Sequence, residues 1–286
     1  MKIAVASGKG GTGKTTVATC LAWTARRRNR DVLYLDCDVE EPNAHLFLEP
    51  DFETGEDVNV FIPQVDETRC TLCGKCAAVC AYHAIAVLGK KTLVFPQLCH
   101  GCGSCSLICP ENAIQEIPNR IGVIEAGTAR RGISFARGVL DVGEPMALPV
   151  IRQLKKWQLP KPGQTVIQDA PPGTSCPVVE TARRSDFILL VTEPTPFGLH
   201  DLRLAAEVAD ELSIPAGVII NRVGIGDSAV EEFCVNRHLP ILMRIPYERR
   251  IAEGVAQGQT LVDIDPGYIR LFQEVFAAIG RMVKQT

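Results

Sequence analysis

The chain has 286 residues, of which 46% are hydrophobic and 22% are charged. This composition excludes a disordered or fibrous chain, and the length suits about two globular domains. With 33 acidic against 30 basic residues the net charge is −3, which argues against a broadly basic surface for nucleic acid. No apolar run approaches the roughly 20 residues of a membrane span, and no secretion signal opens the sequence. We therefore expect a cytoplasmic protein with no membrane span and no nucleic-acid partner.

Short apolar strands alternate with helical segments along most of the chain. Such alternation predicts an α/β fold with a mostly parallel sheet covered by helices on both faces. Strands are expected at 3–6, 32–35, 58–62, 121–124, 166–167, 187–191, 218–220 and 241–245. Helices are expected at 14–28, 202–212, 228–238 and 268–283.

Between residues 64 and 118 this alternation stops, and short hydrophobic pieces lie among closely spaced cysteines. Because the strand–helix pattern resumes after Pro118, the segment interrupts the α/β domain and does not follow it. We expect one domain formed by residues 1–63 and 119–286, and a small inserted domain formed by residues 64–118.

Eight of the twelve cysteines fall between Cys70 and Cys109. A disulfide framework is typical of small secreted chains, whereas clustered thiolates in a chain of this kind are typical metal ligands. The spacing C-x2-C-x2-C-x3-C begins at Cys70 and recurs 29 residues later at Cys99. The repeat predicts two similar halves related by pseudo-twofold symmetry, each with three thiolates on one tight loop.

Residues 8–15, Gly-Lys-Gly-Gly-Thr-Gly-Lys-Thr, match the pattern G-x4-G-K-[ST] between a predicted strand and a predicted helix. Glycines allow successive backbone N–H groups to turn toward phosphate oxygens, and the helix amino terminus adds positive charge. Lys14 is expected to reach the β- and γ-phosphates, and Thr15 to bind Mg²⁺. The predicted phosphate-binding residues are Gly8, Gly10, Gly11, Thr12, Gly13, Lys14, Thr15 and Thr16.

Residues 9–16 resemble the deviant phosphate loop of the MinD/ParA/Mrp ATPases, a family that includes the nitrogenase iron protein. The resemblance extends over the chain outside the insert, and it implies a P-loop ATPase that binds ATP or ADP with Mg²⁺. It further implies an ATP-dependent homodimer, or a heterodimer with a similar chain, in which Lys9 reaches the partner's nucleotide much as an arginine finger does.

The same resemblance implies roles beyond the phosphate loop. Asp38 resembles the first switch, where it orients or deprotonates the attacking water. Asp169 and Gly173 resemble the second switch, in which the carboxylate holds Mg²⁺ through water and the glycine backbone senses the γ-phosphate. With Lys9 and Lys14, these two aspartates form the expected catalytic group. The adenine is expected to lie against Asn221, Arg222 and Pro246.

The cysteine-rich insert resembles a bacterial ferredoxin with two [4Fe–4S] clusters, in which the fourth cysteine of each run binds the other cluster. Zinc is the competing metal, since C-x2-C pairs also form tetrahedral zinc sites. Two complete, repeated runs of four cysteines favour iron–sulfur. One cluster is expected on Cys70, Cys73, Cys76 and Cys109, and the other on Cys99, Cys102, Cys105 and Cys80.

These features together suggest three functions. The first couples nucleotide-driven dimer switching to electron transfer through the two clusters, with a redox protein as partner. The second is an ATP-dependent carrier or scaffold for iron–sulfur or other metal cofactor assembly. Its partner is an apo-metalloprotein, and Cys176, seven residues after Asp169, is a candidate transient site. The third is a positioning or regulatory ATPase of the ParA/MinD kind, in which the insert is structural.

Overall fold

The computed structural model describes residues 1–28 and 30–284, so residues 29, 285 and 286 of the predicted α/β domain lie outside the described part. The described strands are β1 Lys2–Ala6, β2 Val32–Asp36, β3 Asp51–Val65, β4 Ile85–Leu88, β5 Lys91–Val94, β6 Ile114–Ala129, β7 Ile133–Leu140, β8 Thr165–Asp169, β9 Phe187–Thr192, β10 Ala216–Val223 and β11 Ile241–Pro246. The helices are α1 Lys14–Arg27, α2 His45–Leu48, α3 Lys75–Val79, α4 Ser104–Ile108, α5 Ala147–Trp157, α6 Cys176–Ala182, α7 Pro196–Glu211, α8 Ala229–Asn236, α9 Arg249–Ala256, α10 Leu261–Ile264 and α11 Gly267–Val283, with short 3-10 turns at Pro96–Leu98 and Arg130–Gly132. None of these helices combines the length and the apolar character that a membrane crossing requires.

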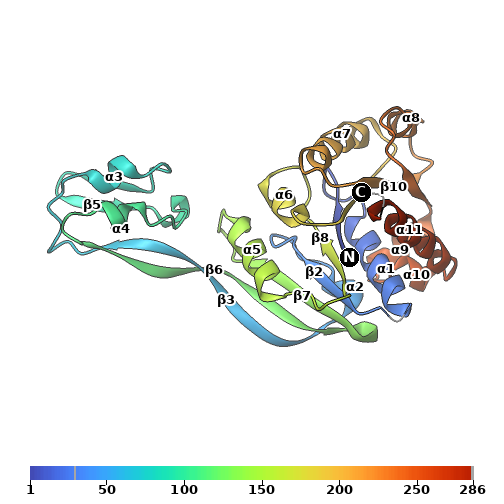
Figure 1. The fold of residues 1–286 in the computed structure, drawn as a ribbon, viewed down its shortest axis with the longest axis horizontal. Helices are drawn as coiled ribbons and strands as arrows, with labels where there is room; N and C mark the ends of the chain where they lie inside the picture. Colours follow the sequence, from blue (N-terminus) through green and yellow to red (C-terminus); the bar gives the residue numbers. More distant parts are fainter. Residues whose placement is uncertain (29, 285–286) are drawn as a thin grey trace.

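One nine-stranded sheet forms the body, in the order β11-β10-β9-β1-β8-β2-β7-β6-β3. The strands from β11 to β7 run parallel, and helices cover both faces (Figure 1). The predicted α/β fold with a mostly parallel sheet is therefore confirmed. At one end of the sheet, β6 runs antiparallel to both β7 and β3.

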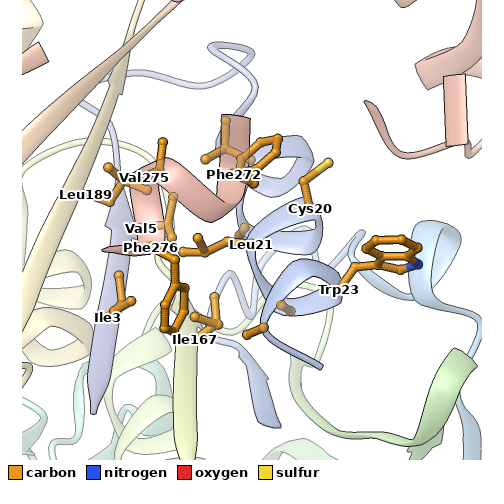
Figure 2. Packing of buried hydrophobic residues seen from close by; sticks show 14 of the residues in the cluster. Ile3, Val5, Cys20, Leu21, Trp23, Ile167, Leu189, Phe272, Val275 and Phe276 are labelled. Atoms are coloured by element: carbon orange, nitrogen blue, oxygen red, sulfur yellow. The ribbon is translucent and has the colours of Figure 1, made fainter. Parts of the chain in front are cut away.

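Apolar helix faces hold the body together on both sides of the sheet. On one face, α1 and α11 pack over β1, β8 and β9, where Leu21, Phe272 and Phe276 meet Ile3 and Val5 (Figure 2). On the other face, α6, α7 and α8 cover the sheet. Such burial of apolar surface is the main stabilising contribution to a fold of this kind.

Strands β3 and β6 extend far beyond their predicted lengths. They pair antiparallel from Asp51 opposite Thr128 to Val65 opposite Ile114. β7 accompanies β6 only as far as Gly122, so the remainder forms a two-stranded ribbon that projects from the body (Figure 1).

The predicted boundaries of the insert, after residues 63 and 118, fall inside these two strands and not at their ends. Proline is tolerated in both because each strand of a two-stranded ribbon has a free edge toward which the position without an N–H can face. Pro63 and Pro118 would interrupt a central strand, but they do not end the two strands of this ribbon.

A small head, residues 66–113, lies at the far end of the ribbon (Figure 1). It contains α3, α4 and the β4–β5 hairpin. One continuous cluster of buried apolar side chains runs from Leu35 in the body through Val58 in the ribbon to Ala84 and Cys99 in the head. The ribbon is thus packed against both the body and the head.

Candidate functional site

The glycine-rich loop joins the end of β1 to the start of α1. Gly11 and Gly13 have φ angles of 76° and 93°, a left-handed conformation that favours glycine. A Cβ atom at Gly13 would also lie 2.4 Å from the side-chain nitrogen of Asn221, and one at Gly8 would lie 2.4 Å from Asp201 on α7. Gly8, predicted for phosphate binding, is therefore also required where α7 packs against the loop.

A cavity of about 330 Å³ opens beside this loop, at the carboxyl edge of the sheet, where ligands of open α/β sheets bind. The predicted residues on its wall are Gly10, Gly11, Gly13, Lys14, Thr15, Thr16, Asp38, Asn221, Arg222 and Pro246. The predicted residues Gly8, Lys9, Thr12, Asp169 and Gly173 do not line it. Other residues that the sequence did not single out also line it, among them Phe47, Tyr247 and Ile251.

Two fully buried carboxyl groups lie side by side near the loop, where β2 ends at Asp36 and β8 ends at Asp169. The Tyr34 hydroxyl donates a hydrogen bond of 2.9 Å to Asp169 Oδ2. Asp169 Oδ1 has no hydrogen-bond partner among the described residues. Burial raises the pKa of Asp169, and the charge of Lys14 and the nearby Thr15 and Tyr34 hydroxyls oppose that rise. A buried carboxylate oxygen without a hydrogen-bond partner can bind a metal ion or a metal-bound water.

Asp36 holds the loop that carries Asp38. Its carboxylate accepts hydrogen bonds from the backbone N–H groups of Asp38 and Ala44, at 3.3 and 3.1 Å. Burial raises the pKa of Asp38 to about 6, with the charge of Lys14 again opposing the rise. A carboxylate with such a pKa is a suitable general base near neutral pH.

Lys9 and Arg222 are joined by a residue that the sequence did not single out. Glu193 follows β9 and is 4% exposed. Its Oε2 lies 3.1 Å from Lys9 Nζ, and its Oε1 lies 2.6 Å from a guanidinium nitrogen of Arg222. The only sequence signal for this role was an acidic residue directly after a wholly buried strand, at the same sheet edge as the phosphate loop.

Two predicted nucleotide contacts involve groups that are bonded to protein atoms in this structure. Asn221 Nδ2 donates to the carbonyl oxygen of Thr12 at 2.8 Å, and Asn221 Oδ1 accepts from the Arg222 N–H at 2.9 Å. The Gly173 N–H donates to the carbonyl oxygen of Ser7 at 3.0 Å. Adenine recognition by Asn221 and γ-phosphate sensing by Gly173 stay predictions, and both require these hydrogen bonds to exchange.

The eight clustered cysteines line two separate hollows in the head. Cys70, Cys73, Cys76 and Cys109 line the first. Cys80, Cys99, Cys102 and Cys105 line the second. The fourth cysteine of each run thus faces the hollow of the other run, and these are the same two groups of four that the sequence predicted. Burial raises the pKa of the Cys76, Cys99 and Cys105 thiols, whereas hydrogen bonding with Ser104 lowers the pKa of Cys102.

The predicted similarity of the two halves is confirmed in backbone detail. Gly74 and Gly103, which precede α3 and α4, have φ angles of 75° and 73°, and His83 and Asn112 have φ angles of 52° and 48°. In each half, the sulfur of the last cysteine accepts a hydrogen bond from the backbone N–H four residues later, at 3.2 and 3.3 Å. Each of these pairs is separated by the 29 residues of the sequence repeat.

Two further observations concern metal ligands. Across residues 1–28 and 30–284, no group of three or more His, Cys, Asp or Glu side chains is gathered closely enough to hold a single metal ion. Cys176 is exposed at the start of α6, three residues after Gly173, and lines neither cysteine hollow.

A parallel sheet with a glycine-rich loop after its first strand and paired acids at two neighbouring strand ends defines a nucleotide-binding protein of the P-loop class. Residues 3–262 match the family described as the CobQ/CobB/MinD/ParA nucleotide binding domain. The chain belongs to this family.

Relatives of nearly equal length occur in Methanocaldococcus jannaschii. The protein MJ0579 is 31% identical over 92% of this chain and 91% of its own length, and MJ0578 is 30% identical over 99% and 98%. The ATP-binding protein MJ0823 from the same organism is 24% identical over the full length of both chains.

Solved structures share the fold at lower identity. The septum site-determining protein MinD of Pyrococcus horikoshii, complexed with Mg-ADP, superposes with a TM-score of 0.59 at 22% identity, covering 96% of this chain and 95% of its own. The cell division ATPase MinD of Pyrococcus furiosus gives 0.56 at 21% identity, covering 97% and 98%. These similarities establish a shared fold.

Proposed function

We propose that the chain binds and hydrolyses ATP in its body, holds two [4Fe–4S] clusters in its head, and couples the two through the ribbon to electron transfer with a redox partner. The observation that carries this proposal is the sorting of eight cysteines into two hollows of four, at the end of a ribbon whose strands belong to the nucleotide-binding sheet.

The residues around the cavity fit a nucleoside triphosphate with Mg²⁺. Lys14 is buried among the glycine N–H groups that suit phosphate oxygens. The Thr15 hydroxyl is the direct ligand that we propose for Mg²⁺, and the unpartnered Oδ1 of Asp169 would hold the ion through water. When bound, the ion neutralises charge that develops on the phosphates during transfer.

In the proposed hydrolysis, Asp38 accepts a proton from water as the water oxygen bonds to the γ-phosphorus. The bond between that phosphorus and the β–γ bridging oxygen breaks, which yields ADP and inorganic phosphate. Lys14 stabilises the charge on the β- and γ-phosphates. Lys9 of a second chain is proposed to act on the same phosphates within an ATP-dependent homodimer, or in a heterodimer with a similar chain.

The two cysteine hollows fit iron–sulfur clusters better than zinc ions. Four zinc ligands surround a single ion at about 2.3 Å. The thiolates of a four-iron cluster bind different iron atoms and stand farther apart. The crosswise arrangement of the fourth cysteine is also that of two-cluster ferredoxins. When bound, such clusters supply reversible one-electron storage, and the cysteines of this chain hold and orient them.

Two routes connect the proposed switches to the ribbon. β2, which ends at Asp36, pairs with β7, and β7 pairs with β6. α5 provides the second route. Its Lys155 ammonium donates to three carbonyl oxygens around the end of α6, at 2.5 to 3.1 Å, and its Gln153 donates to Glu56 of β3 at 3.0 Å. Movement of α6 with the second switch would therefore shift α5, and with it the part of β3 around Glu56 where the ribbon leaves the body.

A second candidate is a positioning or regulatory ATPase with a structural head. It is favoured by the fold shared with proteins described as septum site-determining or cell division ATPases. A third, carriage of metal cofactors to an apo-metalloprotein, is favoured by the exposed Cys176 beside the second switch. In that case iron would be bound in small amounts, removed by chelators and transferred in a way that depends on Cys176.

The deciding experiment measures iron, acid-labile sulfide and zinc in protein isolated without oxygen, together with ATP hydrolysis. We expect iron and sulfide in equal amounts, enough for both hollows, and retained through purification. Lys14→Ala is expected to lose ATP binding while it keeps the iron and sulfide. This variant therefore tests nucleotide binding in the body separately from cluster binding in the head. Zinc without sulfide, or a protein with neither metal, would contradict the cluster assignment.

A further inference from the structure

A second large hollow lies between α5 and α6 on one face of the sheet, where it reaches Lys2 at the start of β1 and Val166 and Gln168 of β8. Its volume is about 520 Å³. One carboxylate, that of Glu180, lines this hollow. The cationic side chains that line it are Lys2, Arg152, Lys155, Lys156, Arg183 and Arg184.

Ordinary structural roles account for two of these six cations. Lys155 donates to the carbonyl oxygens of Glu180, Thr181 and Arg183 and so caps the end of α6. Arg152 pairs with the Glu180 carboxylate at 3.2 Å.

The other four cations are unpaired. Within residues 1–28 and 30–284, the side chains of Lys2, Lys156, Arg183 and Arg184 have neither an ion pair nor a hydrogen bond. Like charges that converge in this way repel one another. Consistent with this, burial lowers the pKa of Lys155, and the charges of Lys2 and Arg183 lower it further.

Arg184 is one of nine described non-glycine residues with a positive φ angle. Its φ angle is 65°, in the left-handed region where glycine is the favoured residue. Glycine would fit this turn after α6 more easily, but it would remove a guanidinium group from the hollow. The sequence thus places a cation where the local backbone favours glycine.

We propose that this hollow, named here the basic hollow, binds a small phosphate-bearing anion with at least two negative charges. Guanidinium groups bind phosphate oxygens through paired N–H donors. Duplex nucleic acid requires an extended basic surface, whereas these cations converge in one cavity of a chain with net charge −3. A bound anion would contact α5 and α6 together and hold them in one arrangement.

The test uses pyrophosphate as the probe and isothermal titration of the full chain. Excess Mg-ADP is present so that the phosphate loop is already occupied. We expect one pyrophosphate per chain and a change in emission from Trp157, which follows Lys156 on α5. Arg184→Gly is expected to weaken binding at least about tenfold, or roughly 1.4 kcal/mol, while the melting temperature stays equal or rises, because glycine relieves the φ angle. Lys156→Glu is expected to weaken binding similarly.

The matched control is Arg281→Glu, an exposed arginine on α11, which should bind pyrophosphate as the wild type does. Absence of binding to the ADP-loaded wild type would overturn the proposal. So would unchanged affinity in Arg184→Gly, or binding of a DNA duplex of about 20 base pairs in preference to pyrophosphate.

Discussion

The Lys9 ammonium lies 3.1 Å from the Glu193 carboxylate of its own chain. Glu193 is buried and also pairs with Arg222, whereas the Lys9 side chain is about one-third exposed. A lysine that reaches a partner's nucleotide must first leave this carboxylate. The ion pair therefore competes with the dimer contact that we propose for Lys9 and lowers the population of the dimer-competent state.

Replacement of Glu193 by glutamine should release this competition. We predict that Glu193→Gln dimerises with Mg-ATP at a severalfold lower protein concentration than the wild type, as measured by analytical ultracentrifugation. Glu231→Gln, which breaks a surface ion pair with Arg244, is the control and should not change dimerisation. Weaker dimerisation in Glu193→Gln would show that the ion pair supports the dimer.

The carboxyl group of Asp38 should make stability depend on pH. Its pKa is raised from 3.8 to about 6, so the folded chain binds this proton more tightly than the unfolded chain does. The resulting stabilisation is fully present below the unfolded pKa and is lost as pH rises through about 6. We predict that the melting temperature of the nucleotide-free protein falls between about pH 4 and 7, and that Asp38→Asn makes this fall shallower.

Asp36 and Asp169, whose pKa values burial also raises, should account for the dependence that remains in Asp38→Asn. Glu211→Gln, at an exposed position on α7, controls for the loss of one negative charge. An unchanged pH dependence in Asp38→Asn would contradict the assignment.

The two cysteine hollows should lose metal independently. Cys73 lines only the first hollow and Cys102 only the second. We predict that Cys73→Ser and Cys102→Ser each lose about half of the iron and sulfide that the wild type binds. Cys176→Ser is the matched control, because Cys176 is exposed like the other two and lines neither hollow. Loss of all iron in both variants alike would contradict two separate sites.

The phosphate loop should depend on its contact with β10. A side chain at Gly13 would be strained, because the φ angle there is 93°. Its methyl group would also clash with the Asn221 side chain. We predict that Gly13→Ala abolishes ATP binding. Asn221→Ala removes the hydrogen bond to the Thr12 carbonyl, and we expect it to weaken both ATP and GTP binding about tenfold, which corresponds to roughly 1.4 kcal/mol. A loss confined to ATP would instead support adenine recognition by Asn221.

Much of the body could be predicted because its signals are local. The glycine loop lies within eight residues, and apolar strands such as β9 are continuous in the sequence. The start of α7 at Pro196, before the predicted Leu202, follows from a local cap in which the Thr195 hydroxyl accepts from the Gly198 N–H at 3.0 Å. The predicted helix began six residues later, at Leu202.

The first half of β3 and the strand β7, from which the ribbon extends, could not be predicted in this way. Residues 51–57 are exposed and, apart from Phe52 and Gly55, polar, yet they form a strand because β6 offers backbone partners at the sheet edge. In β7, which was not predicted, Arg137 is accommodated by an ion pair with Glu125 and by the ring of Phe52, at 4.4 Å. The Lys9–Glu193 pair joins segments 184 residues apart, so only the tertiary fold brings it together.

We propose that the nucleotide state of the body reaches the ribbon and head through α5 and β7. Hydrogen–deuterium exchange of the full chain with Mg-ATP or Mg-ADP tests it most directly. We predict that exchange in α5 and in residues 51–65 and 114–129 differs between the two nucleotides in the wild type, and that Lys14→Ala shows no difference. Equal exchange in those segments with both nucleotides, in a wild-type protein that still hydrolyses ATP, would contradict this coupling.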